Sequence, residues 1–236
     1  SVGLHPTILS EQFEAILAAK GILSVLPHNE TLKLLFDLGG SSTEFLLVDP
    51  RHREPVWSKS IFIGAATTSE QYLAGDPPSN EAIDRAVRFI RNEIGQISTT
   101  VQQSLKQLNA SLQDVSLVGT AGTATTLASM YLKMENYQPH RINGLVLDKN
   151  WLADMTNNLA GLSIAKRRSI PGLERGREDI IVGGALIVLQ VLHTLAKRQL
   201  TVTDAGLLEG LVLDLIEKQR EMPHTLSTSL KWRWPR

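Results

Sequence analysis

Residues 32–49 read LKLLFDLGGSSTEFLLVD, and this stretch decides the fold. Two apolar runs, at 32–36 and 44–48, flank a Gly-Gly turn, which is the pattern of a β-hairpin. Glycines in such a turn let backbone N–H groups approach a ligand closely. Asp37 and Glu44 flank the turn, and carboxylate oxygens are ligands that Mg²⁺ prefers. A plain hairpin with polar turn residues is the alternative interpretation.

The segments on either side of this hairpin carry helix and strand patterns in alternation. Apolar residues recur at helical spacing in 10–24, 81–108, 149–160, 179–197 and 205–218, and in a segment that ends near 132. Further strands are predicted at 56–62, 115–118 and 200–202. This order indicates an α/β fold with a mixed sheet, in which an antiparallel hairpin leads into parallel strands with flanking helices. A ribonuclease-H-like lobe of the actin-like ATPase superfamily is one of several folds with this order.

The composition is that of an ordinary globular protein. The 236 residues include 24 basic and 24 acidic side chains, which gives a formal net charge of zero, and 42% are hydrophobic. A neutral chain is a poor candidate for a protein that binds DNA through net charge, so we expect no DNA partner. The longest apolar stretch, 180–192, is too short to span a bilayer, so we expect no membrane association. The absence of cysteine excludes disulfide scaffolds and thiolate zinc sites, and it fits a cytoplasmic location.

A second glycine-containing loop, VGTAGT at 118–123, lies between a predicted strand and a predicted helix. The N-terminal amides of a helix attract anions, so this loop is a second candidate for phosphate binding. A tight turn whose glycines only permit close packing explains the same sequence. Both loops directly follow predicted strands, and ligands of open α/β sheets gather at the carboxyl ends of the strands.

Charged residues outside the two loops add three further candidates. Glu14 lies among apolar residues of the first predicted helix, and a buried glutamate there would have a raised pKa that suits proton transfer. The local sequence favours instead a solvated glutamate at a helix start. Arg175 and Arg177 lie in the basic stretch 165–177 and could contact phosphate through paired guanidinium donors, although a salt-bridged surface is the alternative. The tail KWRWPR at 231–236 is interpreted as a terminus that docks or frays.

Five blocks of sequence, taken together, resemble one known family. They are LSEQFEA at 9–15, LLFDLGGSSTEFLLVD at 34–49, LVGTAGTATTLA at 117–128, RSIPGLERGREDIIVGGALIVLQVL at 168–192 and VTDAGLLEGLVLDL at 202–215. Their order and spacing resemble the exopolyphosphatase/guanosine pentaphosphate phosphatase (Ppx/GppA) family over about residues 8–217. The most specific block is Asp-x-Gly-Gly-x-Ser-Thr-Glu, at 37–44.

The resemblance implies a fold, a reaction and a set of site residues. The fold is the actin-like fold with two ribonuclease-H-like lobes. The reaction is the Mg²⁺-dependent hydrolysis of terminal phosphoanhydride bonds, in inorganic polyphosphate or in pppGpp. Glu14 would position or deprotonate the attacking water, which overrides the local interpretation, and Asp37 and Glu44 would bind Mg²⁺. The implied phosphate-binding residues are Gly39, Gly40, Ser41, Ser42, Thr43, Gly119, Thr120, Gly122 and Thr123, with Arg175 and Arg177 as further substrate contacts.

The resemblance also implies a division of the chain. Residues 1–25 would be the end of a first lobe and a connecting helix, 26–220 a second lobe, and 221–236 a C-terminal tail. The partners would be polyphosphate or guanosine penta- and tetraphosphate, with a possible homodimer. The chain departs from the family pattern at Phe13, Ile16, Ser41 and Leu208. Because three of these departures remove charges, a non-catalytic nucleotide or polyphosphate binding module is the alternative function, and a kinase-like or ATPase relative ranks third.

Overall fold

The computed structural model describes residues 9–27, 29, 31–51 and 54–219. Within them lies a six-stranded sheet in the order β3-β2-β1-β4-β6-β5. The strands are β1 (Leu32–Leu38), β2 (Thr43–Asp49), β3 (Glu54–Ile61), β4 (Val115–Thr120), β5 (Leu145–Asp148) and β6 (Gln199–Val202). The helices are α1 (Glu11–Val25), α2 (Ala65–Tyr72), α3 (Asn80–Gln107), α4 (Ala121–Tyr131), α5 (Pro139–Ile142), α6 (Lys149–Ala160), α7 (Ile164–Arg167), α8 (Ile181–Thr194) and α9 (Leu207–Gln219), with a 3₁₀ turn at Leu112–Asp114.

The pairing of the strands confirms the predicted mixed sheet. β1 and β2 form an antiparallel hairpin in which Asp37 lies opposite Glu44. β1 also pairs in parallel with β4, and β4 pairs in parallel with β6. β5 adds an antiparallel edge that the sequence analysis did not predict.

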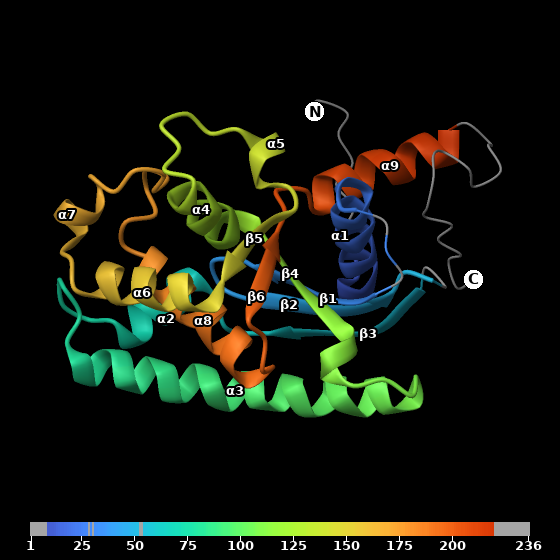
Figure 1. Cartoon of the computed structure of the whole chain (residues 1–236), viewed down its shortest axis with the longest axis horizontal. Helices are drawn as coiled ribbons and strands as arrows, with labels where there is room; N and C mark the ends of the chain where they lie inside the picture. Colours follow the sequence, from blue (N-terminus) through green and yellow to red (C-terminus); the bar gives the residue numbers. More distant parts are fainter. Residues whose placement is uncertain (1–8, 28, 30, 52–53, 220–236) are drawn as a thin grey trace, which may run out of the picture.

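Helices cover both faces of the sheet. Figure 1 shows α1 and α9 on one side of the strands and α3 and α8 on the other. Successive side chains of a strand point to opposite faces, and β1 follows this rule. Leu34 and Phe36 join the larger core together with α3 and α8, whereas Leu35 joins the smaller core together with α1. The strand is therefore buried on both faces, which explains its nearly continuous apolar run.

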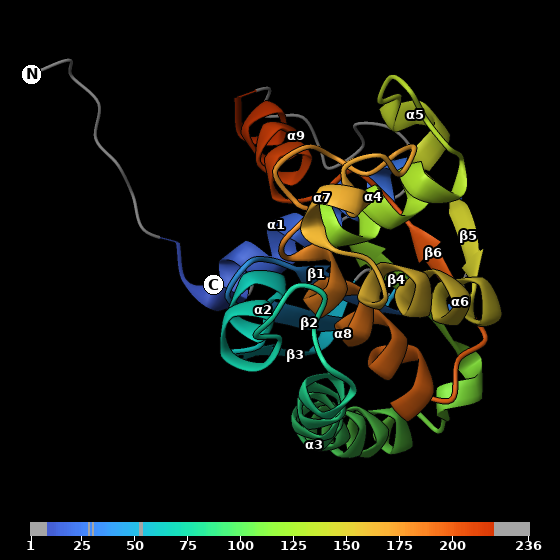
Figure 2. The same ribbon diagram turned by 90° about the vertical axis from the view of Figure 1, so that its left-hand side faces the viewer.

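Tight packing fixes α1 against α9. A Cβ atom on Gly21 would lie 2.0 Å from the carbonyl oxygen of Gly206, so only a glycine fits between the two helices there. The fully buried ammonium of Lys20 donates to the Glu217 carboxylate over 2.6 Å and lies 3.6 Å from that of Asp214. Buried charges need such partners. α1 and α9 are therefore held side by side (Figures 1 and 2).

The division of the chain into lobes stays a prediction. The boundary at 25/26 coincides with the end of α1 at Val25, and the tail 221–236 lies outside the described residues. None of the described helices is long and apolar enough to cross a bilayer. The cytoplasmic location stays a prediction as well.

Candidate active site

The first loop, residues 39–42, joins β1 to β2 and is hydrogen-bonded to the start of α2. The Gly39 amide donates to the Ser42 carbonyl over 3.0 Å and closes the turn. The amides of Ala65 and Ala66 donate to the carbonyl oxygens of Gly39 and Gly40 over 3.0 and 2.9 Å. The N-terminal amides of a helix lack partners within the helix, and here the loop carbonyls satisfy them. The loop is therefore built before any ligand arrives.

Gly64 is a functional position that the sequence analysis missed. A Cβ atom there would lie 2.3 Å from the backbone of Gly40, so a side chain at 64 would displace the loop. The sequence signal was slight, because it consisted of one glycine two residues after the predicted strand 56–62. α2 was missed with it, because its sequence AATTSEQY is short and has no apolar stripe.

The side chains of the first loop point in different directions. Gly40 and Ser41 are exposed, and Gly39 and Ser42 are partly buried. Thr43 is fully buried, and its hydroxyl donates to the Ile63 carbonyl over 2.6 Å. At Thr43, a contact to phosphate would have to come from the backbone rather than from the hydroxyl.

Three predicted carboxylates lie near enough to this loop for their charges to interact. The pKa of Asp37 is raised to about 6. Burial is the largest cause, and the negative charges of Glu44 and Glu14 add to it. Glu44 lies opposite Asp37 on β2, and its Oε1 accepts a hydrogen bond from the Ser60 hydroxyl over 3.0 Å. Glu14 comes from α1 and is exposed. The fold therefore concentrates negative charge at this point, which a cation would relieve.

The carboxylates of Asp37 and Glu44 fit Mg²⁺ in number, but they do not complete its coordination shell. Mg²⁺ is usually held by one or two carboxylates, and water and substrate phosphates complete its shell. Asp37 and Glu44 supply that number. Within the described part of the chain, no group of three or more His, Asp or Glu side chains could hold a metal ion. A metal ion here would thus depend on oxygens that the chain does not supply.

The second loop lies next to the first at the same edge of the sheet. Asp37 pairs with Thr120 in the parallel ladder, so β1 and β4 end side by side. The Thr120 hydroxyl donates to the Ala205 carbonyl over 2.9 Å, and the buried Thr123 side chain packs against Gly184. Gly119 serves close packing, since a Cβ atom there would lie 2.8 Å from the Phe36 ring. These side chains support the turn rather than face a ligand.

The start of α4 has two features that close packing of the second loop does not explain. Ala121 has φ +66°, a left-handed conformation that costs a residue with a Cβ atom about 1–2 kcal/mol. No side chain caps this helix. Such strain clusters at functional sites, and uncapped N-terminal amides attract anions.

Arg177 lies directly over this helix start. A Cβ atom on Gly122 would lie 2.1–2.3 Å from the atoms of the Arg177 guanidinium, so the guanidinium rests on the glycine. Arg177 also forms an ion pair with Glu174. A cation is unfavourable at the positive end of a helix, and the carboxylate of Glu174 compensates for it. Arg175 lies with Arg177 in the wall of a neighbouring cavity of about 1110 Å³.

Comparison with known proteins identifies the family. The model of the Ppx/GppA phosphatase family matches residues 1–219. The chain belongs to this family. Exopolyphosphatase 2 of Mycobacterium tuberculosis is 31% identical over 217 residues, which are 90% of the chain and 65% of that protein. A guanosine-5'-triphosphate,3'-diphosphate pyrophosphatase of Pseudoalteromonas atlantica is 21% identical over 205 residues, which are 85% of the chain and 36% of that protein.

Solved structures of Ppx/GppA proteins share the fold. The crystal structure of the Aquifex aeolicus family member superposes with a TM-score of 0.78 at 24% identity, and it covers 93% of the chain and 67% of that protein. The predicted family and the actin-like α/β fold are thereby confirmed. The chain spans 65% of the length of the Mycobacterium tuberculosis exopolyphosphatase, 67% of that of the Aquifex aeolicus protein and 36% of that of the Pseudoalteromonas atlantica protein.

Proposed function

We propose that this Ppx/GppA chain supplies the metal- and phosphate-binding wall of a hydrolase that removes terminal phosphates from polyphosphate or from pppGpp. The observation that carries the proposal is the pairing of Asp37 with Glu44 beside a loop that α2 holds in place, within reach of the charge of Glu14. Phosphoryl transfer needs this combination of positioning and charge compensation more than covalent chemistry. The names of the two relatives, an exopolyphosphatase and a guanosine-5'-triphosphate,3'-diphosphate pyrophosphatase, support the two substrate classes.

Asp37 and Glu44 are the residues that would hold Mg²⁺. When bound, the ion would neutralise charge on the phosphoryl oxygens of the substrate. The pKa of Asp37, at about 6, keeps most of this carboxyl ionised at neutral pH and ready to accept a cation. Ser60 holds the Glu44 carboxylate through its hydrogen bond, so this side chain is oriented before binding.

Glu14 would act on the attacking water. It is exposed at the start of α1, close enough to Asp37 for its charge to raise the pKa of that residue. A carboxylate at this position accepts a hydrogen bond from water and orients it toward a phosphoryl group held by the two loops. A Cβ atom on Gly210 would lie 1.8 Å from the Leu17 carbonyl oxygen, so close packing of α1 on α9 fixes the backbone one turn beyond Glu14.

The test replaces Glu14 and measures phosphate release. We expect Glu14→Gln to lower turnover of polyphosphate and of pppGpp about 100-fold or more in the presence of Mg²⁺, because general-base contributions have this size. The melting temperature should stay unchanged, because Glu14 is exposed. Glu81→Gln, at the exposed start of α3, is the matched control. Both variants should be assayed beside the wild-type chain. Phosphate release at the wild-type rate by Glu14→Gln would exclude the role.

Binding without turnover is the second candidate function, and the departures from the family pattern favour it. Ile16 is buried and Leu208 is 73% exposed, where the family pattern has arginines. Phe13 replaces a glutamate and lies under the Lys218 ammonium, 5.6 Å from the ring centre. Calorimetry separates the two functions: tight binding of pppGpp or polyphosphate with no phosphate released would favour the binding module.

A further inference from the structure

Helix α9 carries an apolar stripe on its outer face. Leu208, Val212 and Leu215 are 73%, 54% and 49% exposed, and their spacing of four and three residues places them on one side of the helix. Figures 1 and 2 show α9 at the outside of the molecule, where it packs on α1. A surface helix normally turns its apolar stripe toward the core. Among the described residues, no element covers this stripe.

A groove lies beside the stripe, between α9 and the end of α1. Its volume is about 310 Å³, and its lining residues are Ser24, Leu208, Glu209, Val212 and Leu213. The neighbouring Val25 adds a further exposed apolar side chain. The lining thus combines apolar surface with one carboxylate and one hydroxyl. It suits a large apolar side chain that carries one hydrogen-bond donor, which describes the indole of tryptophan.

The C-terminal tail, residues 221–236, starts close to this face. It follows the end of α9 at Gln219 with one residue between, and its 16 residues reach about 50 Å when extended. The stripe begins four residues before the end of α9, and it is about 10 Å long. The tail is therefore long enough to turn back and run along the whole stripe.

The composition of the tail complements the groove. Trp232 and Trp234 come 13 and 15 residues after the end of α9, so a tail that turns back can bring them to the groove near the start of that helix. Basic residues outnumber acidic ones in the tail; they are Lys231, Arg233 and Arg236 against Glu221. The cations next to the tryptophans would then lie near the Glu209 carboxylate, which attracts them.

We propose that the C-terminal tail docks on the outer face of α9 and places one of its tryptophans in the groove beside Ser24 and Glu209. A second copy of the chain is the competing occupant. A stable dimer buries about 800 Å² on each partner, and a stripe of about 10 Å on one helix offers far less. A tethered segment needs less surface, because the tether gives it a high effective concentration at the groove.

The test observes the tail through its own tryptophans. Trp57→Phe together with Trp151→Phe leaves Trp232 and Trp234 as the only tryptophans of the chain. The groove shields an indole from solvent, so we expect acrylamide to quench the emission at least about twofold less than in the same protein unfolded in urea. The emission should also lie at shorter wavelength. Quenching equal to that of the unfolded protein would overturn the proposal and leave the stripe to a separate partner.

Substitutions on the stripe then locate the contact. Leu208→Asp and Val212→Asp each place a charge on the docking face, and each should raise the quenching to the level of the unfolded protein. Both residues are more than half exposed, so α9 should stay folded, which circular dichroism checks. Val146→Asp, at an exposed apolar residue of β5, is the matched control and should leave the quenching unchanged. Shielding that survives both stripe variants would overturn the proposal, because the tail would then dock elsewhere.

Dilution distinguishes a tail bound within one chain from a contact between copies. An intramolecular contact does not depend on protein concentration, so about tenfold dilution should leave the emission and the quenching unchanged. Loss of the shielding on dilution, with a dimer in sedimentation at the higher concentration, would overturn the proposal in favour of a second copy. These measurements use no substrate, so their outcome is separate from that of the proposed function.

Discussion

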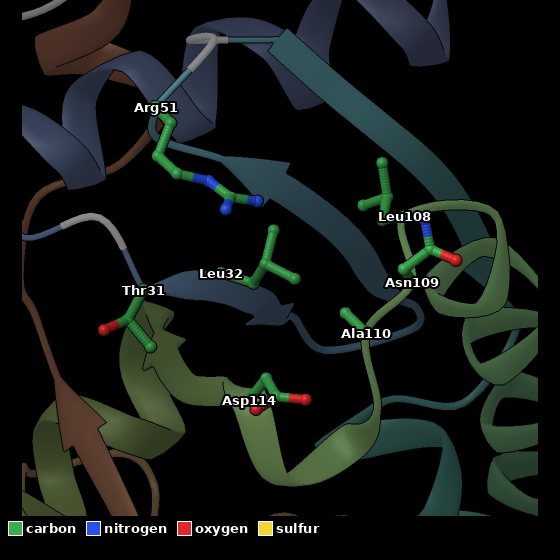
Figure 3. Close-up of a pocket in the computed structure, with 7 residues that line it drawn as sticks. All are labelled: Thr31, Leu32, Arg51, Leu108, Asn109, Ala110 and Asp114. Carbon is green, nitrogen blue, oxygen red and sulfur yellow. The ribbon is translucent and has the colours of Figure 1, made fainter.

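The amino and carboxyl ends of the central strands β1 and β4 differ in whether their charged side chains have compensating partners. At the amino ends of β1 and β4 lies a cavity of about 600 Å³, lined by Thr31, Leu32, Arg51, Leu108, Asn109, Ala110 and Asp114 (Figure 3). Its charged groups are satisfied locally: Arg51 pairs with Asp49 over 2.9 Å, and the Asp114 carboxylate accepts hydrogen bonds from Ser111 that lower its pKa. At the carboxyl ends, Asp37 is buried near two other carboxylates, and its pKa is raised.

This contrast and the larger cavity beside the second loop both favour the carboxyl edge as the place of the proposed site. A cation stabilises a carboxylate less when hydrogen bonds already lower its pKa than when burial and like charges raise its pKa. Perturbed groups of the second kind gather at functional sites. The carboxyl edge also carries the left-handed Ala121 and the loop that only a glycine at 64 permits.

The largest expected effect comes from Gly64→Ala. The new Cβ atom would lie 2.3 Å from the Gly40 backbone, so we expect a loss of about 3 kcal/mol in the free energy of unfolding. Gly95→Ala is the control, because a Cβ atom there meets nothing within 4 Å, and a helix gains about 1 kcal/mol from this change. Urea unfolding measures both. If the Gly64→Ala protein is as stable as the wild type, the first loop does not require a glycine at 64, and this difference between the two edges is lost.

An intermediate effect is expected from Asp37→Asn in Mg²⁺-free buffer. The pKa of Asp37 is raised in the folded state, from 3.8 to about 6, so the folded state binds the proton more tightly. The stability that this provides is full below pH 4 and is lost as the pH rises through 6. At pH 7.5, Asp37→Asn should therefore raise the free energy of unfolding by roughly 2 kcal/mol, with no gain at pH 3.

Asp114→Asn tests the opposite edge with the same chemistry. The pKa of Asp114 is lowered in the folded state, so ionised Asp114 stabilises the fold above its ordinary pKa. The substitution should lower stability at neutral pH, opposite in sign to Asp37→Asn. Urea unfolding at several pH values checks both, and the same sign for the two variants would break the contrast between the edges.

The smallest effect on the free energy of unfolding is expected from placing glycine at a residue with a left-handed backbone conformation. Ala121→Gly removes a Cβ atom at φ +66°, and the gain should be about 1 kcal/mol after the added entropy of the unfolded chain. Asn109, at φ +53° beside the other cavity, is a residue type that tolerates this conformation, so Asn109→Gly should gain less. Thermal unfolding compares the two, and a larger gain at 109 would argue against strain at the second loop.

Much of the fold was predictable because its signals are local. Residues 32–49 carry two apolar runs and a glycine turn, and the structure has β1 and β2 at those positions. The long apolar stripe of 81–108 predicted a helix, and the structure has α3 at Asn80–Gln107 with Ser79 as its N-cap. α2 could not be predicted in this way, because three of its backbone amides donate to the Gly39 and Gly40 carbonyls, which lie more than twenty residues earlier.

The sequence by itself determined the order of the elements, the two loops and the identity of the candidate carboxylates. Short-range periodicity and turn chemistry suffice for that, because each depends on neighbours along the chain. Only the tertiary structure decided which of those residues meet. Glu14 affects the pKa of Asp37 across 23 positions, and Arg177 rests on Gly122 across 55. Electrostatic and steric interactions depend on distance in space, so they exist only after the chain has folded.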